Sequence, residues 1–196
     1  IVSREIPVLE PGRGEVRVRL AYSGVNFMDV YTRLGRYAGS SATSGHYESG
    51  LPLTLGIEGA GCIDAIGADV HGWQVGDRVA YALSRGTYAE YGIVPERLLA
   101  RVPDALDLKR AAASLFHGVT AHYLAYDVGR LSSGMSCLVH AGAGGIGQIL
   151  IQLAKSVGAQ VIATASSAAK RDIARLRGAD HVADYVNDHF VDACKV

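Results

Sequence analysis

The sequence predicts an α/β protein in which a β-rich N-terminal region precedes a doubly wound parallel sheet. Two observations predict this class. Between residues 53 and 102, short β-rich runs are separated by Gly and Pro at roughly eight- to twelve-residue intervals, which is typical of a compact antiparallel barrel or sandwich. From residue 135 onward, apolar strands alternate with amphipathic helices, and this β-α-β-α-β order implies a parallel sheet with right-handed crossovers.

The N-terminal elements follow from local patterns. Residues 15–22 alternate apolar and charged side chains, as a half-buried strand does. Residues 26–34 predict a short helix that Asn26 caps and Gly35 ends. Residues 38–50 are small and polar without periodicity, so we expect an exposed loop there.

The C-terminal elements begin with an Ala-rich helical pattern over 108–128. Strands are expected at 136–140, 161–163 and 181–183, and a second helix at 169–176 with Gly178 as its stop. The helix between the first two strands ends at Gly158 and carries an apolar stripe of Ile146, Ile149, Leu150, Leu153, Ala154 and Val157. We therefore expect one domain over 1–115 and the N-terminal part of a second over 116–196.

Composition restricts the classes of partner. The chain has 196 residues, 49% of them hydrophobic, and its 19 basic residues balance its 19 acidic ones. Disorder is excluded, and neither a nucleic-acid nor a membrane partner is expected. Three Cys without a C-x-x-C pair favour a reducing, cytoplasmic compartment over a disulfide scaffold or a zinc knuckle. The chain opens at Ile1 and lacks a signal-like segment, and we expect a fragment.

The turn at 142–147, Gly-Ala-Gly-Gly-Ile-Gly, matches G-x-G-x-x-G between a predicted strand and a predicted helix. In that context Gly142 permits a tight turn, Gly144 lets the backbone approach a pyrophosphate, and Gly147 lets the helix pack closely on the strand. The helix amides then face the anion. A glycine-rich turn without a ligand is the alternative.

The residues after the second predicted strand indicate which dinucleotide binds. NAD sites usually carry Asp or Glu there to bind the ribose 2′-hydroxyl. This chain has no carboxylate between Thr164 and Asp172, and it has Lys170 and Arg171 instead. Cations suit a 2′-phosphate, so NADP(H) is favoured over NAD(H). The alternative is a solvated helix start with ordinary surface cations.

The segment GVNFMDVYTRLGRY at 24–37 resembles the G-x-N-F-x-D-x-Y-x-R-x-G-x-Y segment of zinc-independent quinone oxidoreductases, the zeta-crystallin-like branch of the medium-chain dehydrogenase/reductase superfamily. Later blocks follow in the order of that family: GIEGAG at 56–61, GDRV at 76–79, AAA at 111–113, GVTA at 118–121 and the glycine turn. The resemblance implies a GroES-like catalytic domain, followed by the first half of a Rossmann domain, with NADPH between them.

The resemblance also implies roles for single residues. It places the catalytic candidates Asn26 and Tyr31 beside the nicotinamide, with Thr120 near it. The glycine turn would hold the pyrophosphate through Gly142, Gly144, Gly145, Ile146 and Gly147, and the residues around the 2′-phosphate would be Ser166, Lys170 and Tyr185.

Departures from the zinc-dependent branch suggest the chemistry. That branch has Cys where this chain has Asn26 and His where it has Ile57, and an amide and a butyl group do not replace these zinc ligands. We therefore expect no metal, and a hydride transfer to a quinone or a conjugated carbonyl compound. The 38–50 loop is longer than usual in the family, which suggests a lid or specificity element.

Two further expectations come from length. A Rossmann sheet usually has six strands, and this chain supplies three. We expect these 196 residues alone to be inactive and the full-length form to be a homodimer.

The sequence is also consistent with other functions. An enoyl or alkenal double-bond reductase, including a module of a polyketide or fatty-acid synthase, would use the same scaffold. A non-catalytic role as a crystallin-like NADPH-binding protein or an RNA-binding protein belongs to a different class. Among single residues, Glu58 favours a buried polar contact over a catalytic carboxylate. His117 and His122 are expected on different faces of a helix, which argues against a zinc pair.

Overall fold

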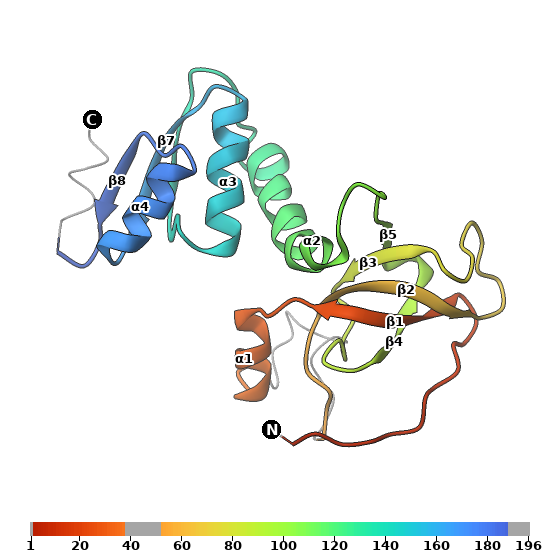
Figure 1. Cartoon of the computed structure of the whole chain (residues 1–196). Helices are drawn as coiled ribbons and strands as arrows, with labels where there is room; N and C mark the ends of the chain where they lie inside the picture. Colours follow the sequence, from red (N-terminus) through yellow and green to blue (C-terminus); the bar gives the residue numbers. More distant parts are fainter. Residues whose placement is uncertain (1, 38–51, 188–196) are drawn as a thin grey trace. The chain divides into compact units, whose positions relative to one another are not determined.

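The computed structural model describes residues 2–37 and 52–187, and it divides into two compact units (Figure 1). The first unit is Ile1–Phe116 and the second is His117–Val196. One antiparallel and one parallel sheet are present, which confirms the predicted fold class. The loop expected at 38–50 lies outside the described residues.

The first unit is built on a five-stranded antiparallel sheet of order β4-β1-β2-β3-β5. Its strands are β1 (Glu15–Ser23), β2 (Glu58–Ile66), β3 (Arg78–Ala82), β4 (Tyr91–Pro95) and β5 (Leu99–Arg101). The predicted strand at 15–22 is β1. Alternate residues of four strands form a buried cluster of Val16, Val18, Ile63, Val79, Tyr81 and Val94.

A second cluster joins this sheet to α2 (Leu108–His122). Ala60 and Ala80 of the sheet pack against Ala111 and Ala112 of the helix, and small side chains on both elements permit this close approach. A wider, π-type turn over Tyr123–Val128 continues the helix. The helical pattern predicted over 108–128 is therefore confirmed, with a change of pitch in its last six residues.

Helix α1 (Phe27–Arg33) begins at the N-cap residue Asn26, as predicted. The Asp29 carboxylate accepts a hydrogen bond from the Asn26 backbone amide at 2.8 Å, so the first turn is closed by its own third residue. Gly35, with φ of +68°, supplies the left-handed residue that ends the helix.

The second unit contains a parallel sheet of order β6-β7-β8. Its elements in chain order are β6 (Ser136–Val139), α3 (Gly145–Ser156), β7 (Gln160–Ala165), α4 (Ala168–Leu176) and β8 (His181–Asp184). All five predicted elements are present. Gly158 and Gly178, with φ of +80° and +105°, follow the two helices as expected.

The buried side of α3 differs in detail from the predicted stripe. Gly147, Ile151 and Ala154 are the fully buried residues of this helix. Of the predicted stripe only Ala154 is fully buried, and the other members are half-buried. The reason is that apolar residues occupy most of the helix circumference, so a 3.6-residue period does not single out the centre of the buried face.

Candidate functional site

Two glycines of the turn between β6 and α3 are required by packing. A Cβ atom at Gly147 would lie 2.4 Å from the backbone oxygen of Ala141 and 2.9 Å from the Cα of Gly142. A Cβ atom at Gly142 would lie 2.8 Å from the Cβ of Ala163 in β7. These two positions therefore hold the helix and the turn close to the sheet, as the sequence predicted.

The N-terminus of α3 has no side-chain cap. Its N-cap residue is Gly144, and the amides of the first turn, from Gly145 to Gly147, have no acceptor within the helix. In α4, by contrast, the hydroxyl of the N-cap residue Ser167 accepts a hydrogen bond from the Lys170 amide at 3.4 Å. Exposed amide donors at a helix start are the donor set that binds phosphate groups, so the turn fits a pyrophosphate.

The ring of His117 lies against the first turn of α3. A Cβ atom at Gly145 would lie 2.6 to 2.9 Å from three atoms of this ring. A side chain at position 145 would therefore require the His117 ring to move, which is a constraint that the motif does not supply. Sequence reasoning missed this contact, because no local signal links His117 to the glycine turn.

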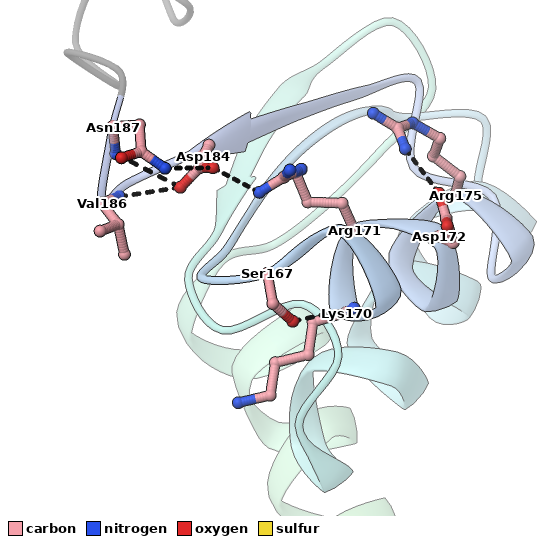
Figure 2. Close-up of polar contacts among 8 residues, drawn as sticks. All are labelled: Ser167, Lys170, Arg171, Asp172, Arg175, Asp184, Val186 and Asn187. Atoms are coloured by element: carbon pink, nitrogen blue, oxygen red, sulfur yellow. Dashed lines mark hydrogen bonds and ion pairs between the residues drawn. The ribbon is translucent and has the colours of Figure 1, made fainter.

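The three residues expected around a 2′-phosphate follow β7 and β8, two neighbouring parallel strands, on the C-terminal side of each strand. Figure 2 shows Lys170 of this set, with the residues that surround it on α4 and after β8. Ser166 directly follows β7 and is half-buried, Lys170 lies exposed in the first turn of α4, and Tyr185 directly follows β8 and is 50% exposed. Figure 2 shows that the side chains of Lys170 and Arg171 extend in different directions. Lys170 forms no ion pair with the described part of the chain.

Arg171 is held by a carboxylate that the sequence analysis did not consider. Its Nη1 lies 2.5 Å from Oδ2 of Asp184, the last residue of β8, and both side chains are largely buried. Asp184 also accepts hydrogen bonds from the Asn187 side chain at 3.0 Å and from the Val186 amide at 3.0 Å. These hydrogen bonds, together with the charge of Arg171, lower the pKa of Asp184.

The sequence did contain a signal for this pair. The carboxyl ends of parallel strands meet at one edge of a sheet, and Asp184 follows the predicted strand 181–183 directly. A carboxylate there is expected close to the start of α4.

In the first unit, Asn26 belongs to a buried polar cluster. The side chains of Asn26 and Glu58 are buried, and the Asn26 amide donates to Glu58 Oε2 at 3.2 Å. Glu58 Oε1 accepts a hydrogen bond from the Phe116 backbone amide at 2.5 Å. The expectation of a buried polar contact at Glu58 is confirmed.

Asp29 ties the same cluster to a third segment. Its Oδ2 atom accepts hydrogen bonds from the Asn26 backbone amide and from the Tyr88 hydroxyl, both at 2.8 Å. Partial burial, followed by the hydrogen bond to Asp29, raises the pKa of the Tyr88 phenol. Asn26 is therefore held through its side chain and through its backbone.

Tyr31 lies on α1 among other planar side chains. The centroid of its ring is 6.2 Å from that of Phe27 and 6.1 Å from that of Tyr37, and the Arg36 guanidinium lies 5.3 Å from its centre. The Phe27 ring is 78% exposed. The planes of these rings are inclined to one another, by 44° for Phe27 with Tyr31 and by 74° for Tyr31 with Tyr37, so a planar ligand could stack on one exposed ring such as that of Phe27. The remaining predicted residue, Thr120, is half-buried on α2 and falls in the second unit.

Two features are absent from residues 2–37 and 52–187. No group of three or more His, Cys, Asp or Glu side chains in this part of the chain is placed to hold a metal ion. No described helix has the length and apolar character needed to cross a membrane.

Comparison with known proteins matches both units. Residues 12–104 match the family "Alcohol dehydrogenase GroES-like domain" and residues 145–196 match "Zinc-binding dehydrogenase". Quinone oxidoreductase from Pseudomonas aeruginosa is 41% identical over 187 residues, which is 95% of this chain and 55% of that protein. Erythronolide synthase EryA2 from Saccharopolyspora erythraea is 41% identical over 172 residues, which is 87% of this chain and 4% of the synthase.

A solved structure is similar as well. The quinone oxidoreductase of Escherichia coli, determined in complex with NADPH, superposes with a TM-score of 0.90 at 34% identity, covering 98% of this chain and 56% of that one. The chain thus spans about half the length of the quinone oxidoreductases that it matches. With a GroES-like antiparallel unit followed by a Rossmann-like parallel unit, the chain has the fold of the medium-chain dehydrogenase/reductase superfamily, and over most of its length it is similar to the quinone oxidoreductases of that superfamily.

Proposed function

We propose that this chain is part of an NADPH-dependent oxidoreductase that transfers a hydride to a quinone. The observation that carries the proposal is the uncapped N-terminus of α3, which lies at the carboxyl edge of a parallel sheet together with Lys170. Residues 1–115 would form the catalytic and substrate domain, and residues 116–196 the first part of the cofactor domain. The proposal includes a cytoplasmic homodimer without nucleic-acid or membrane partners.

The second unit would hold the cofactor at two places. The turn from Gly142 to Gly147 would hold the pyrophosphate, with backbone amides as donors. Ser166, Lys170 and Tyr185 would surround the 2′-phosphate, where the ammonium supplies charge and the hydroxyls supply hydrogen bonds. The NADPH complex of the Escherichia coli relative supports this choice of cofactor.

The first unit would position the reacting partners. Bound NADPH would supply the hydride, so that a quinone, NADPH and one proton give a hydroquinone and NADP⁺. Asn26, fixed by Glu58 and Asp29, would orient the nicotinamide together with Tyr31 and Thr120. The exposed Phe27 ring of α1 would favour planar acceptors, and the proton would come from solvent or from the Tyr31 hydroxyl.

We propose that the reaction needs no zinc. Asn26 and the buried side chain of Ile57 stand where the zinc-dependent branch has its Cys and His ligands. Neither side chain binds zinc in proteins. The acceptor must therefore be electrophilic without Lewis-acid activation, as quinones and conjugated carbonyl compounds are.

Calorimetric titration of the complete protein with NADPH and with NADH tests the cofactor site. We expect NADPH to bind at least about tenfold more tightly, because only NADPH carries the 2′-phosphate that pairs with Lys170. Lys170→Ala should remove most of this difference. Lys109→Ala, which changes an exposed lysine of the first unit, should leave it intact. Equal affinities, or no binding of either nucleotide, would refute the proposal.

The second candidate function is that of an enoyl or alkenal reductase, either as a separate enzyme or as a module of a synthase. The match to a polyketide synthase favours it. NADPH consumption by the complete protein, with a simple quinone, a conjugated enone and an enoyl thioester as acceptors, separates the two. We expect the quinone to give the highest kcat/KM and a metal chelator to leave the rate unchanged. A clear preference for the thioester would favour the alternative.

A further inference from the structure

We propose that Arg171 and Asp184 form a charge-neutral pair that determines the preference for NADPH over NADH. This inference rests on the proposed function, since it concerns the same cofactor site. Arg171 neutralises the Asp184 carboxylate, which would otherwise repel a 2′-phosphate and could accept a hydrogen bond from a ribose 2′-hydroxyl. Lys170 is then the cation that acts on the 2′-phosphate.

The first observation is the strand register. β7 ends at Ala165, the position after which NAD sites usually carry the acidic residue for the ribose 2′-hydroxyl. β8 runs parallel to β7, and its Asp184 is the direct partner of Ala165 in the register. The neighbouring strand therefore brings a carboxylate to the edge where the sequence of β7 supplies none.

The second observation is how fully this carboxylate is engaged. Oδ2 accepts hydrogen bonds from Arg171 Nη1 at 2.5 Å and from Asn187 Nδ2 at 3.0 Å. Oδ1 accepts hydrogen bonds from the backbone amides of Val186 at 3.0 Å and Asn187 at 3.4 Å. A carboxylate has about four lone-pair positions, so these donors leave little capacity for a ribose hydroxyl.

The third observation is the charge balance at this edge. Arg171 and Asp184 are 21% and 12% exposed, so their charges are poorly screened by water and largely cancel each other. Lys170, on the preceding position of α4, has no ion pair in the described part of the chain (Figure 2). Of these three side chains, Lys170 is then the one whose charge is not compensated within residues 2–37 and 52–187.

Removing the charge of Arg171 should therefore change specificity. In Arg171→Met the aliphatic stem remains, but Asp184 keeps its negative charge and regains an acceptor position. The carboxylate would repel a 2′-phosphate and could accept a hydrogen bond from a 2′-hydroxyl. We expect the ratio of the NADH to the NADPH dissociation constant to fall by roughly tenfold.

The test measures both dissociation constants by calorimetry on the complete protein, at low salt, for matched variants. Arg171→Met should lower the ratio, and Arg171→Met combined with Asp184→Asn should restore it, since the repelling charge is then absent. Arg175→Met is the control, because Arg175 pairs at 2.8 Å with the exposed Asp172 further along α4 (Figure 2). Its ratio should equal that of the wild type.

The outcomes separate the possibilities. An unchanged ratio in Arg171→Met, or a lowered ratio that Asp184→Asn does not restore, overturns the inference and indicates a purely structural ion pair. If Arg171→Met does not fold, Asp184→Asn alone decides, because it should raise the preference for NADPH by releasing Arg171. An unchanged or lower preference in that variant overturns the inference. Failure of the wild type to bind either nucleotide rejects the proposed function and this inference with it.

Discussion

The two units build their polar sites in different ways. The cluster of the first unit joins side chains from separate segments, with Asn26 and Asp29 at the start of α1, Glu58 at the start of β2, and Tyr88 in the loop before β4. The site of the second unit is a single six-residue turn, 142–147, that offers backbone amides. In the first unit both Glu58 oxygens and one Asp29 oxygen accept hydrogen bonds, while Asn26 Oδ1 and Asp29 Oδ1 are buried without a partner among the described residues. In the second unit the start of α3 has no side-chain acceptor.

The difference indicates where each site is vulnerable. A mutually bonded, buried cluster holds the local structure together, so losing one member leaves its partners buried without hydrogen bonds. A backbone turn depends on the absence of side chains, so adding one atom displaces it. We expect substitutions in the first site to lower stability chiefly because buried polar groups lose their hydrogen-bond partners. Substitutions in the second site should lower stability chiefly because the added atoms clash with neighbouring atoms.

The largest effect is expected for Glu58→Ala. The substitution leaves the Phe116 amide and the Asn26 side chain without their acceptor, and it creates a cavity beside Gly24. We expect the free energy of unfolding to fall by about 3 kcal/mol in urea denaturation. Glu90→Ala, at an exposed carboxylate of the same unit, should change it by less than about 0.5 kcal/mol. Similar losses for both variants would contradict the structural role of the cluster.

Gly147→Ala tests the steric requirement of the turn. The new Cβ atom would lie 2.4 Å from the Ala141 oxygen, and backbone on both sides must shift to admit it. We expect a loss of about 2 kcal/mol in the free energy of unfolding, measured by urea denaturation, together with weaker NADPH binding. Gly118→Ala, in α2 with no atom within 4 Å of its new Cβ, should be neutral or stabilising by up to about 1 kcal/mol. A destabilisation of both variants by the same amount would argue against a special requirement at 147.

The second unit should also lose stability in acid. Lys155, 2.8 Å from both oxygens of Asp180, is the main cause of the lowered pKa of that carboxyl, and the Val161 amide adds to it. The folded protein then binds this proton less readily than the unfolded chain, so the stabilisation is present above the unfolded pKa of about 3.9 and is lost as the pH falls through the lower folded pKa. The pKa of Asp184 is lowered in the same direction.

Thermal unfolding between about pH 2 and pH 7 measures this loss. The melting temperature of the wild type should decrease once the pH is lowered below about 4. The melting temperature of Asp180→Asn should be lower than that of the wild type at neutral pH and should decrease less steeply in acid. An equally steep fall in both proteins would show that Asp180 is not a source of the acid sensitivity.

The smallest effect is expected at the cap of α4. The Ser167 hydroxyl accepts from the Lys170 amide at 3.4 Å, which is a long hydrogen bond. Ser167→Ala should therefore lower the free energy of unfolding by only about 0.5 kcal/mol, at the low end for helix caps. Ser167→Thr keeps the hydroxyl and should retain most of the wild-type value. If the free energy of unfolding of Ser167→Ala fell by well above 1 kcal/mol, Ser167 would have to stabilise more of the structure than the first turn of α4.

Local sequence was enough to predict much of the second unit. The strands, the two helices and the glycine turn follow from periodicity, from stop residues such as Gly158 and Gly178, and from a motif of six consecutive residues. These features depend on neighbours within a few positions along the chain, where spacing determines which groups can meet. The same is true of α1, where Asn26, Asp29 and Gly35 specify both ends.

Contacts between distant segments depended on the tertiary structure. The bond between Asn26 and Glu58, the ring of His117 against Gly145, and the pair of Arg171 with Asp184 join residues that no local pattern connects. Each arises because strands or helices pack side by side, and the register of β7 with β8 decides that Asp184 stands next to Ala165. Sequence by itself determined the elements and the glycine turn at 142–147, since these form from adjacent residues. Only the packing of these elements decided which charges meet, because electrostatic and hydrogen-bond interactions act over a few ångströms in space, whatever the separation along the chain.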